Sequence, residues 1–161
     1  MVTTDKLDRV DLQILRALQD NARLTMKEVA SRVALSPTPV FERIKRLERQ
    51  GYIKKYTVIL DEEKLHRGFT VFCKVKLTHI NNENAGNFTR AVMAMTQVTE
   101  CYNISGSYDY LLKISVTDMK SYKDFLLNVL GKIDNLASLE SVFVMDIIKQ
   151  SYGVTLPNLA E

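Results

Sequence analysis

The chain has 161 residues, of which 46% are hydrophobic and 25% charged, so it can bury one or two ordinary cores and shows no bias toward disorder. No apolar run approaches the ~20 residues that a membrane helix requires, and the first residues lack the apolar core of a signal peptide. We therefore expect a soluble, cytoplasmic protein without a membrane partner.

The net charge of +3 is unevenly divided along the chain. Residues 1–60 hold 12 Lys and Arg against 7 Asp and Glu, whereas residues 61–161 hold 10 against 12, so the two parts carry +5 and −2. A basic module of this kind is typical of proteins that meet a polyanion, although a solvated basic surface gives the same count. We place the domain boundary between residues 60 and 61, where a polar segment begins that ends in glycine at Gly68.

Two helices are predicted in the first 33 residues. The first begins near residue 7 with Asp8 as its N-cap and is apolar along one side. The second begins at Thr25 and Glu28, which have capping-box spacing, and ends near Val33. Only two residues separate it from the next helix, and so short a turn indicates a helix-turn-helix.

The segment from Ser36 to Gly51 predicts a third helix that is strongly basic. Ser36 is a favourable N-cap, and Gly51 supplies the stop. Val40, Ile44 and Leu47 form an apolar stripe that must face a core. We predict that the remaining arc and the first turn contact double-stranded DNA. The predicted DNA-binding residues of this helix are Ser36, Thr38, Pro39, Arg43, Lys45, Arg46 and Arg49.

A β-prone run at residues 52–60 predicts a wing or a short strand that leads out of this module. Lys54 lies in the run and is the eighth predicted DNA contact, through phosphate. A solvated turn explains Lys54 about as well, and a capped surface helix with solvated Arg and Lys is the corresponding alternative for the third helix.

The second module has the element order β-α-β-β-α-β. The predicted ranges are Phe69–Thr78, Glu83–Met95, Val98–Ser105, Tyr108–Val116, Ser121–Leu130 and Leu139–Lys149. This order predicts a ferredoxin-like (ACT-like) antiparallel sheet with both helices on one face, so the whole chain is of the α+β class. We expect residues such as Val71, Cys73 or Ile114 on the bare face to be covered by a second subunit, which predicts a homodimer.

Asp109 is the only acid in an apolar and aromatic stretch that follows a turn at Gly106. Its carboxylate could accept hydrogen bonds from the ammonium group of a small amino acid, while nearby backbone N–H groups meet the ligand's carboxylate. The alternative is a hairpin turn in which Asp109 caps backbone donors.

The remaining titratable groups do not predict a metal, redox or catalytic site. Cys73 and Cys101 lie in separate strand-like segments without metal or redox spacing and predict two buried thiols. His66 and His79 form no metal cluster, and no pair of carboxylates or nucleophile with a base is apparent. We expect no metal, no cofactor and no enzymatic activity.

Five motifs of this chain resemble the Lrp/AsnC family, the leucine-responsive and asparagine-responsive transcriptional regulators of bacteria and archaea. They are Leu-Asp-Arg-Val-Asp, Leu-Ser-Pro-Thr-Pro, Arg-Leu-Glu-Arg-Gln-Gly-Tyr-Ile, Gly-Ser-Tyr-Asp-Tyr-Leu-Leu-Lys and Val-Met-Asp-Ile-Ile-Lys-Gln-Ser. The resemblance implies an N-terminal winged helix-turn-helix and a C-terminal domain for effector binding and oligomerisation. It also implies dimers that assemble into tetramers or octamers and bind an amino acid between dimers.

The resemblance assigns residues to both sites. It selects Ser36, Thr38, Arg43 and Arg46 as DNA contacts. It implies an effector site, shared across subunits, of Asn103, Gly106, Ser107, Tyr108, Asp109, Met119, Val142, Phe143 and Val144. Ser107 and Asn103 differ from the residues typical of leucine-responsive members, which disfavours leucine as the ligand. A DNA-wrapping architectural protein without a ligand and an amino-acid-sensing subunit of a metabolic enzyme remain the alternatives.

Overall fold

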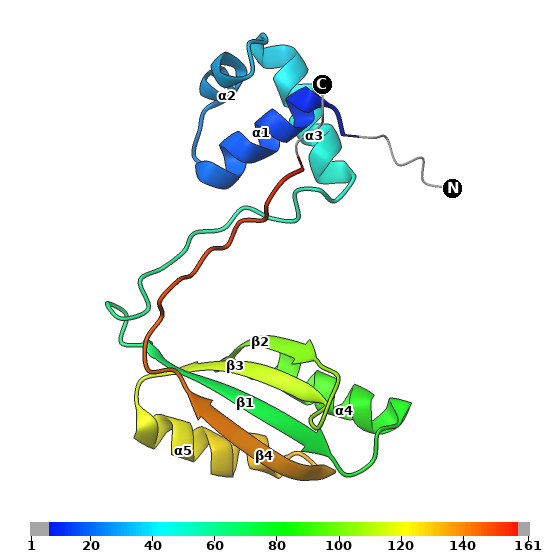
Figure 1. The fold of residues 1–161 in the computed structure, drawn as a ribbon, viewed down its shortest axis with the longest axis vertical. Coiled ribbons are helices and arrows are strands. Elements are labelled where there is room, and N and C mark those ends of the chain that lie inside the picture. The colour runs from blue at the N-terminus through cyan, green and yellow to red at the C-terminus, as the bar shows by residue number, and fades with distance from the viewer. Residues whose placement is uncertain (1–6, 158–161) are drawn as a thin grey trace. The chain divides into compact units, whose positions relative to one another are not determined.

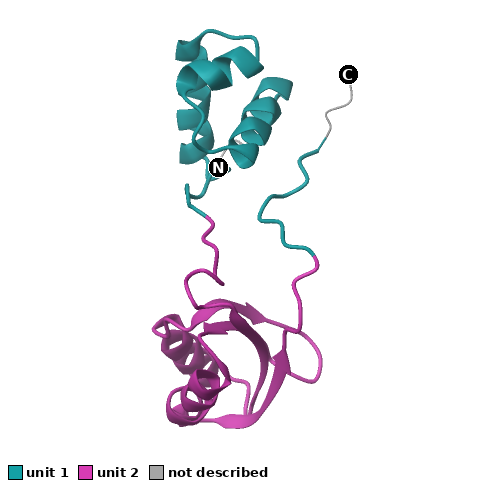
Figure 2. Ribbon diagram, turned by 90° about the vertical axis from the view of Figure 1, so that its left-hand side faces the viewer, with its two compact units in different colours: residues 1–58, 149–161 teal, residues 59–148 magenta. Residues whose placement is uncertain are grey.

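A computed structural model describes residues 7–157 of the protein (Figure 1). The chain divides into two compact units, one of residues 1–58 with 149–161 and the other of residues 59–148 (Figure 2). The segment that follows the second unit thus belongs with the first. Each unit has a hydrophobic core of its own.

The first unit contains three helices, α1 (Arg9–Asp20), α2 (Met26–Arg32) and α3 (Pro37–Arg49). Both predicted caps are confirmed: Asp8 caps α1, and Thr25 forms a capping box with Glu28 on α2. The core lies between the three helices, and the predicted stripe of α3 faces it. Its fully enclosed members are Ile14, Val29, Ala30, Val33, Val40, Ile44 and Leu47.

The start of α3 differs from the expectation in one detail. Ser36 occupies the N-cap position, but its hydroxyl accepts no hydrogen bond from the first turn. An N-cap oxygen bonds the N–H group of the second or third helical residue, and the third is Pro39, which has no N–H. The end is as predicted, because Gly51 has a φ of +79° directly after the last turn.

Residues 52–68 form neither a helix nor a strand, so the predicted short strand is not present. A strand needs a neighbouring strand to pair with its N–H and C=O groups. The described residues of the first unit offer none, because their regular elements are all helices. The hydroxyl of Tyr56 donates to Glu48 Oε1 at 3.0 Å and so attaches the beginning of this segment to α3.

The second unit confirms the predicted ferredoxin-like order. Its elements are β1 (Phe69–Leu77), α4 (Asn82–Met93), β2 (Val98–Asn103), β3 (Tyr110–Val116), α5 (Met119–Asn128), a 3-10 turn (Leu130–Lys132) and β4 (Leu136–Phe143). The sheet order is β2-β3-β1-β4, and every pair is antiparallel. The last strand was expected at Leu139–Lys149, but β4 begins at Leu136 and ends at Phe143. Phe143 lies opposite Val71, near the beginning of β1.

The assignment of residues to the two faces of the sheet was also wrong. Val71, Cys73 and Ile114 are fully buried in the core that α4 and α5 cover, and both helices lie on this face (Figure 2). The alternate residues point to the other face, which we call the outer sheet face. That face is mixed: it carries the charged residues Lys74, Lys76, Lys113, Glu100 and Glu140 together with the apolar residues Phe72, Leu111 and Val142. The three residues from which we predicted the dimer are therefore covered by helices of the same chain.

The two cysteines lie in different environments. Cys73 is buried as expected, and burial raises the pKa of its thiol to about 11. Cys101 is exposed, contrary to the expectation, because it lies on β2, the edge strand, most of which the helices leave uncovered.

The chain returns to the first unit after β4 and attaches to α1. The side-chain amide of Gln19 donates to the carbonyl of Val154 and accepts from its N–H group, both at 3.0 Å. Arg16 Nη2 donates to the carbonyl of Pro157 at 3.1 Å. The two attachment points lie one turn apart on α1, so the returning segment follows this helix.

Candidate nucleic-acid interface and effector site

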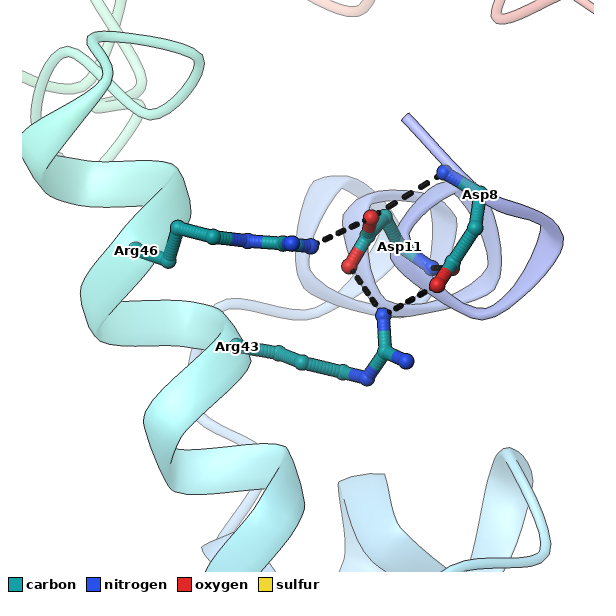
Figure 3. A network of polar contacts seen from close by, with 4 residues as sticks. All are labelled: Asp8, Asp11, Arg43 and Arg46. Carbon is teal, nitrogen blue, oxygen red and sulfur yellow. Dashed lines mark hydrogen bonds and ion pairs between the residues drawn. The ribbon is translucent and has the colours of Figure 1, made fainter. Parts of the chain in front are cut away.

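Two arginines of α3 bind the acidic residues that begin α1 (Figure 3). Arg43 Nη1 donates to Asp8 Oδ2 at 2.5 Å and to Asp11 Oδ1 at 2.7 Å. Arg46 Nη2 donates to Asp11 Oδ2 at 2.5 Å, so each carboxylate oxygen of Asp11 accepts from one guanidinium. The backbone N–H of Asp8 also donates to Asp11 at 3.1 Å. We call these four residues the α1–α3 ion-pair cluster.

The cluster is electrostatically self-contained. Asp11 is fully buried, and the side chains of Arg43 and Arg46 are each only 28% exposed. Burial raises the pKa of Asp8, but hydrogen bonds from the Asp11 N–H and from Arg43 outweigh it and hold this pKa below its usual value. Hydrogen bonds to Asp8 and Asp11 raise the pKa of Arg43. Removing one partner would leave a buried charge uncompensated, so the cluster fixes α3 against α1.

The exposed face of α3 is therefore narrower than the basic arc predicted from the sequence. Its residues follow the spacing i, i+3, i+4, i+7, i+11 and are Thr38, Phe41, Glu42, Lys45 and Arg49. Phe41 and Glu42 were not singled out from the sequence, although a helical projection centred on Lys45 places both on this face. Lys45 Nζ lies 5.7 Å from the centre of the Phe41 ring and 3.0 Å from Glu48 Oε2.

The eight predicted DNA-binding residues fall into two groups. Arg43 and Arg46 are partly buried in the ion-pair cluster. The other six are exposed: Ser36, Thr38, Pro39, Lys45, Arg49 and Lys54. A DNA duplex that approached the exposed face of α3 would thus meet a turn rich in Ser, Thr and Pro, followed by Lys45 and Arg49. Contact of any of these residues with DNA stays a prediction.

In the second unit, Asp109 is buried and its carboxylate has two partners. Oδ2 accepts from the backbone N–H of Leu77 at 2.8 Å, and Oδ1 accepts from Lys76 Nζ at 2.9 Å. Burial raises the pKa of Asp109, but the bonds from Leu77 and Lys76 outweigh it, and the pKa lies below its usual value. The backbone donor comes from the neighbouring strand β1, and not from the hairpin turn that the alternative envisaged.

The turn that precedes Asp109 is exposed to solvent. Gly106, with a φ of +122°, and Ser107 are exposed. The side chain of Asn103 donates to the carbonyl of Asp109 at 2.9 Å and closes the hairpin. Tyr108 donates its hydroxyl to Glu140 Oε2 at 2.7 Å, on the outer sheet face.

The remaining predicted effector residues lie at the opposite end of the sheet. Asp109 precedes Tyr110, which pairs with Val75, whereas Phe143 pairs with Val71 near the other end of β1. The N-terminus of α5 is at this second end as well, because it follows β3 directly. Asp109 is bonded to Leu77 and Phe143 is paired with Val71, which lies six residues earlier in β1. Six strand residues span about 20 Å. One chain therefore does not bring Met119, Val142, Phe143 and Val144 to Asp109, and the predicted site requires residues of two subunits.

Two further features bear on the chemistry of the described residues. Among residues 7–157, no three His, Cys, Asp or Glu side chains are grouped so that they could hold a metal ion. No helix in the same range is both long and apolar enough to cross a membrane.

Family models match both units of the chain. A model described as winged helix-turn-helix DNA-binding matches residues 7–54, and one described as Lrp/AsnC ligand binding domain matches residues 70–154. The Bkd operon transcriptional regulator of Pseudomonas aeruginosa is 39% identical over 87% of this chain and 92% of its own length. The leucine-responsive regulatory protein of Escherichia coli is 39% identical over 90% of this chain and 88% of its own.

Solved structures agree with these matches. A transcriptional regulator from Neisseria meningitidis, crystallised as a complex with L-methionine, has a TM-score of 0.89 and 33% identity over 93% of this chain and 97% of its own. An AsnC family regulator from Agrobacterium tumefaciens has a TM-score of 0.88 and 33% identity over 92% and 97%. The helix-turn-helix with its exposed basic face, the ferredoxin-like second unit and these relatives show that the chain belongs to the Lrp/AsnC family of DNA-binding transcriptional regulators.

Proposed function

We propose that this regulator binds double-stranded DNA with the exposed face of α3, as a homodimer in the cytoplasm, and that a small amino acid modulates it. The observation that carries the proposal is the division of the α3 cations. Arg43 and Arg46 bind Asp8 and Asp11, whereas Lys45 and Arg49 point away from the core. Paired helices of this kind enter successive major grooves, so the operator is a pseudo-palindrome with half-sites ~10 bp apart.

Within this proposal the cations have separate roles. Lys45, Arg49 and Lys54 contact phosphates and supply most of the affinity, because each neutralised phosphate releases counterions. Arg43 and Arg46 are positioning residues that hold α3 at a fixed angle to α1. No cofactor or catalytic step is part of this function.

Binding of a labelled duplex, followed by fluorescence anisotropy, tests the DNA-binding part. Lys45→Ala is expected to weaken binding, whereas Lys123→Ala, which removes an exposed lysine from α5, leaves it unchanged. Equal affinity for the wild type and Lys45→Ala would contradict the role of this face of α3.

The effector is proposed to bind beside Asp109, together with Met119 and residues 142–144 of a second subunit. The match to a ligand-binding domain and the relative that binds L-methionine support an amino acid. Lys76 Nζ occupies the position on Asp109 Oδ1 that a ligand's ammonium group would take, and the side chain of Lys76 is 35% exposed. Entry of the ligand would therefore displace Lys76 from Asp109.

Isothermal titration calorimetry with each of the twenty amino acids tests this site. Lys76→Met is expected to strengthen binding of the effector, because a competing ammonium is removed, and Lys123→Met is the matched control. Ser107→Arg, which fills the exposed turn, is expected to abolish binding. Failure of all twenty amino acids to bind would contradict the effector part and favour an architectural role.

The proposed assembly is a homodimer that forms tetramers or octamers. Light scattering with mass detection, before and after addition of the effector, tests it directly. A monomeric mass at all concentrations would contradict a shared effector site, because one chain keeps Asp109 and Phe143 at opposite ends of β1.

A further inference from the structure

We infer that Phe41 is a specificity-determining residue, and that it recognises the C5-methyl group of thymine in the major groove. The inference rests on the proposed function of α3 and deepens it. It assigns recognition of one chemical group to a side chain that neither the basic pattern nor the ion pairs of α3 explain.

Phe41 does not belong to the core of its unit. Val40, Ile44 and Leu47 are 0–5% exposed and complete the buried stripe of α3, whereas Phe41, about a quarter turn around the helix from this stripe, is 44% exposed. It is the fifth residue of the helix, one turn after Thr38 and one turn before Lys45. An aromatic ring left half-exposed at the edge of a polar helix face forgoes part of the free energy of burial unless a partner covers it.

The neighbours of Phe41 favour a base edge over a phosphate. Glu42 is exposed beside it, and a carboxylate is repelled by the DNA backbone. Lys45 Nζ lies 5.7 Å from the centre of the ring, which helps to hold the ring at the surface. Residues in the N-terminal half of a recognition helix are those that reach base edges.

One group on the base edges of the major groove is apolar, namely the thymine methyl. The polar edge groups are hydrogen-bond donors and acceptors, which a phenyl ring cannot satisfy, and cytosine presents only a hydrogen at C5 where thymine has its methyl. A ring presented to the groove at this position therefore gains free energy at thymine and loses it where a polar edge is desolvated. Thr38, one turn earlier, adds a hydroxyl and a methyl group to the same exposed face of α3.

The experiment removes the methyl group from the DNA and the ring from the protein. Preferred sites are first selected from randomised duplexes with the full-length protein. Each thymine of a selected site is then replaced singly by deoxyuridine, which lacks only the C5-methyl, and the affinities of the wild type, Phe41→Ala, Phe41→Leu and Tyr52→Ala are measured. Tyr52 is the control, because it is an exposed aromatic residue of similar exposure, 42%, that lies outside α3.

The wild type is expected to bind about fourfold more weakly when a single thymine that Phe41 contacts is replaced, the value of one buried methylene-sized group. Phe41→Ala should bind thymine and deoxyuridine equally at that position, whereas Phe41→Leu and Tyr52→Ala should retain the difference. The Leu variant keeps the experiment informative if the Ala variant is unstable.

Three results would overturn the inference and leave the proposed function intact. A wild type that is indifferent to deoxyuridine at every position excludes methyl recognition. A penalty that persists unchanged in Phe41→Ala assigns it to another residue. A lower oligomer mass for Phe41→Ala, without any deoxyuridine effect, would mean that another copy of the chain covers the ring. Failure to select any site contradicts the proposed function itself, and the inference with it.

Discussion

Among residues 7–157, each unit of this regulator buries one carboxylate that accepts hydrogen bonds from a neighbouring element, and the two carboxylates have different partners. Asp11 accepts from two guanidinium groups of α3, and these arginines are mostly covered. Asp109 accepts from one backbone N–H and from Lys76, a flexible cation that is 35% exposed. Arginine holds a fixed planar geometry, whereas lysine is a mobile point charge. The comparison indicates a rigid helix contact in the first unit and an exchangeable one in the second.

The largest expected effect is that of removing the Asp11 carboxylate. Asp11→Ala leaves Arg46 without its carboxylate partner and Arg43 with Asp8 alone, and should lower the free energy of unfolding of the first unit by about 3–5 kcal/mol. Urea denaturation followed by circular dichroism measures it. Asp20→Ala is the control, because Asp20 is 78% exposed and pairs with Arg32 at 3.6 Å; its cost should be within ~0.5 kcal/mol. Equal costs for both variants would mean that the cluster does not hold α3.

A smaller effect is expected at Asp109. Asp109→Ala removes the acceptor of the Leu77 N–H and should destabilise the second unit by about 1–3 kcal/mol, the cost of one buried unsatisfied donor. Lys76→Met should cost less, because the carboxylate keeps its backbone donor. If Lys76→Met proved as destabilising as Asp109→Ala in the same urea experiment, Lys76 would be a fixed partner and not an exchangeable one.

The same carboxylate makes stability depend on pH. The folded pKa of Asp109 lies below its ordinary value of 3.8, so the ionised form is favoured by folding. The stabilisation that ionised Asp109 gives the folded state is fully present above the pKa of the unfolded chain. It is lost as the pH falls through the pKa of the folded protein. Between about pH 5 and about pH 2.5, the wild type should therefore lose stability more steeply than Asp109→Asn in the same urea experiment. Identical slopes would exclude Asp109 as a contributor.

The smallest effects concern the helix caps. Thr25→Ala removes a complete capping box and should cost about 1 kcal/mol. Ser36→Ala removes a hydroxyl that makes no cap hydrogen bond and should cost less than ~0.5 kcal/mol. Thermal unfolding of the two variants side by side measures the difference. A larger cost for Ser36→Ala would mean that its hydroxyl caps α3 in solution despite Pro39.

Local patterns predicted most of the fold. Caps at Asp8 and Thr25, the stop at Gly51 and the β-α-β-β-α-β order all depend on neighbouring residues, and all were correct. The errors concern features that depend on distant partners. Alternation along β1 separates Val71 from Lys74, but it does not say which set the helices cover. The end of β4 and the exposure of Cys101 likewise follow from the extent and order of the sheet.

The candidate site shows the same limit. The sequence marks Arg43 and Arg46 as basic residues of a helix, and both were predicted to face DNA. Their partners Asp8 and Asp11 are 32 to 35 residues away, and only the crossing of α1 and α3 brings them together. Residue type therefore indicated the module, but tertiary packing decides which of its cations are accessible.

The salt dependence of DNA affinity tests the division of the α3 cations most directly. We compare Arg49→Gln with Arg43→Gln, because glutamine removes the charge in both and still offers Asp11 a hydrogen-bond donor at position 43. For Arg49→Gln, the slope of log affinity against log salt should decrease by about 0.9 for each phosphate that the variant no longer neutralises, and for Arg43→Gln it should not change. A decreased slope for a folded Arg43→Gln, with an unchanged one for Arg49→Gln, would contradict the account.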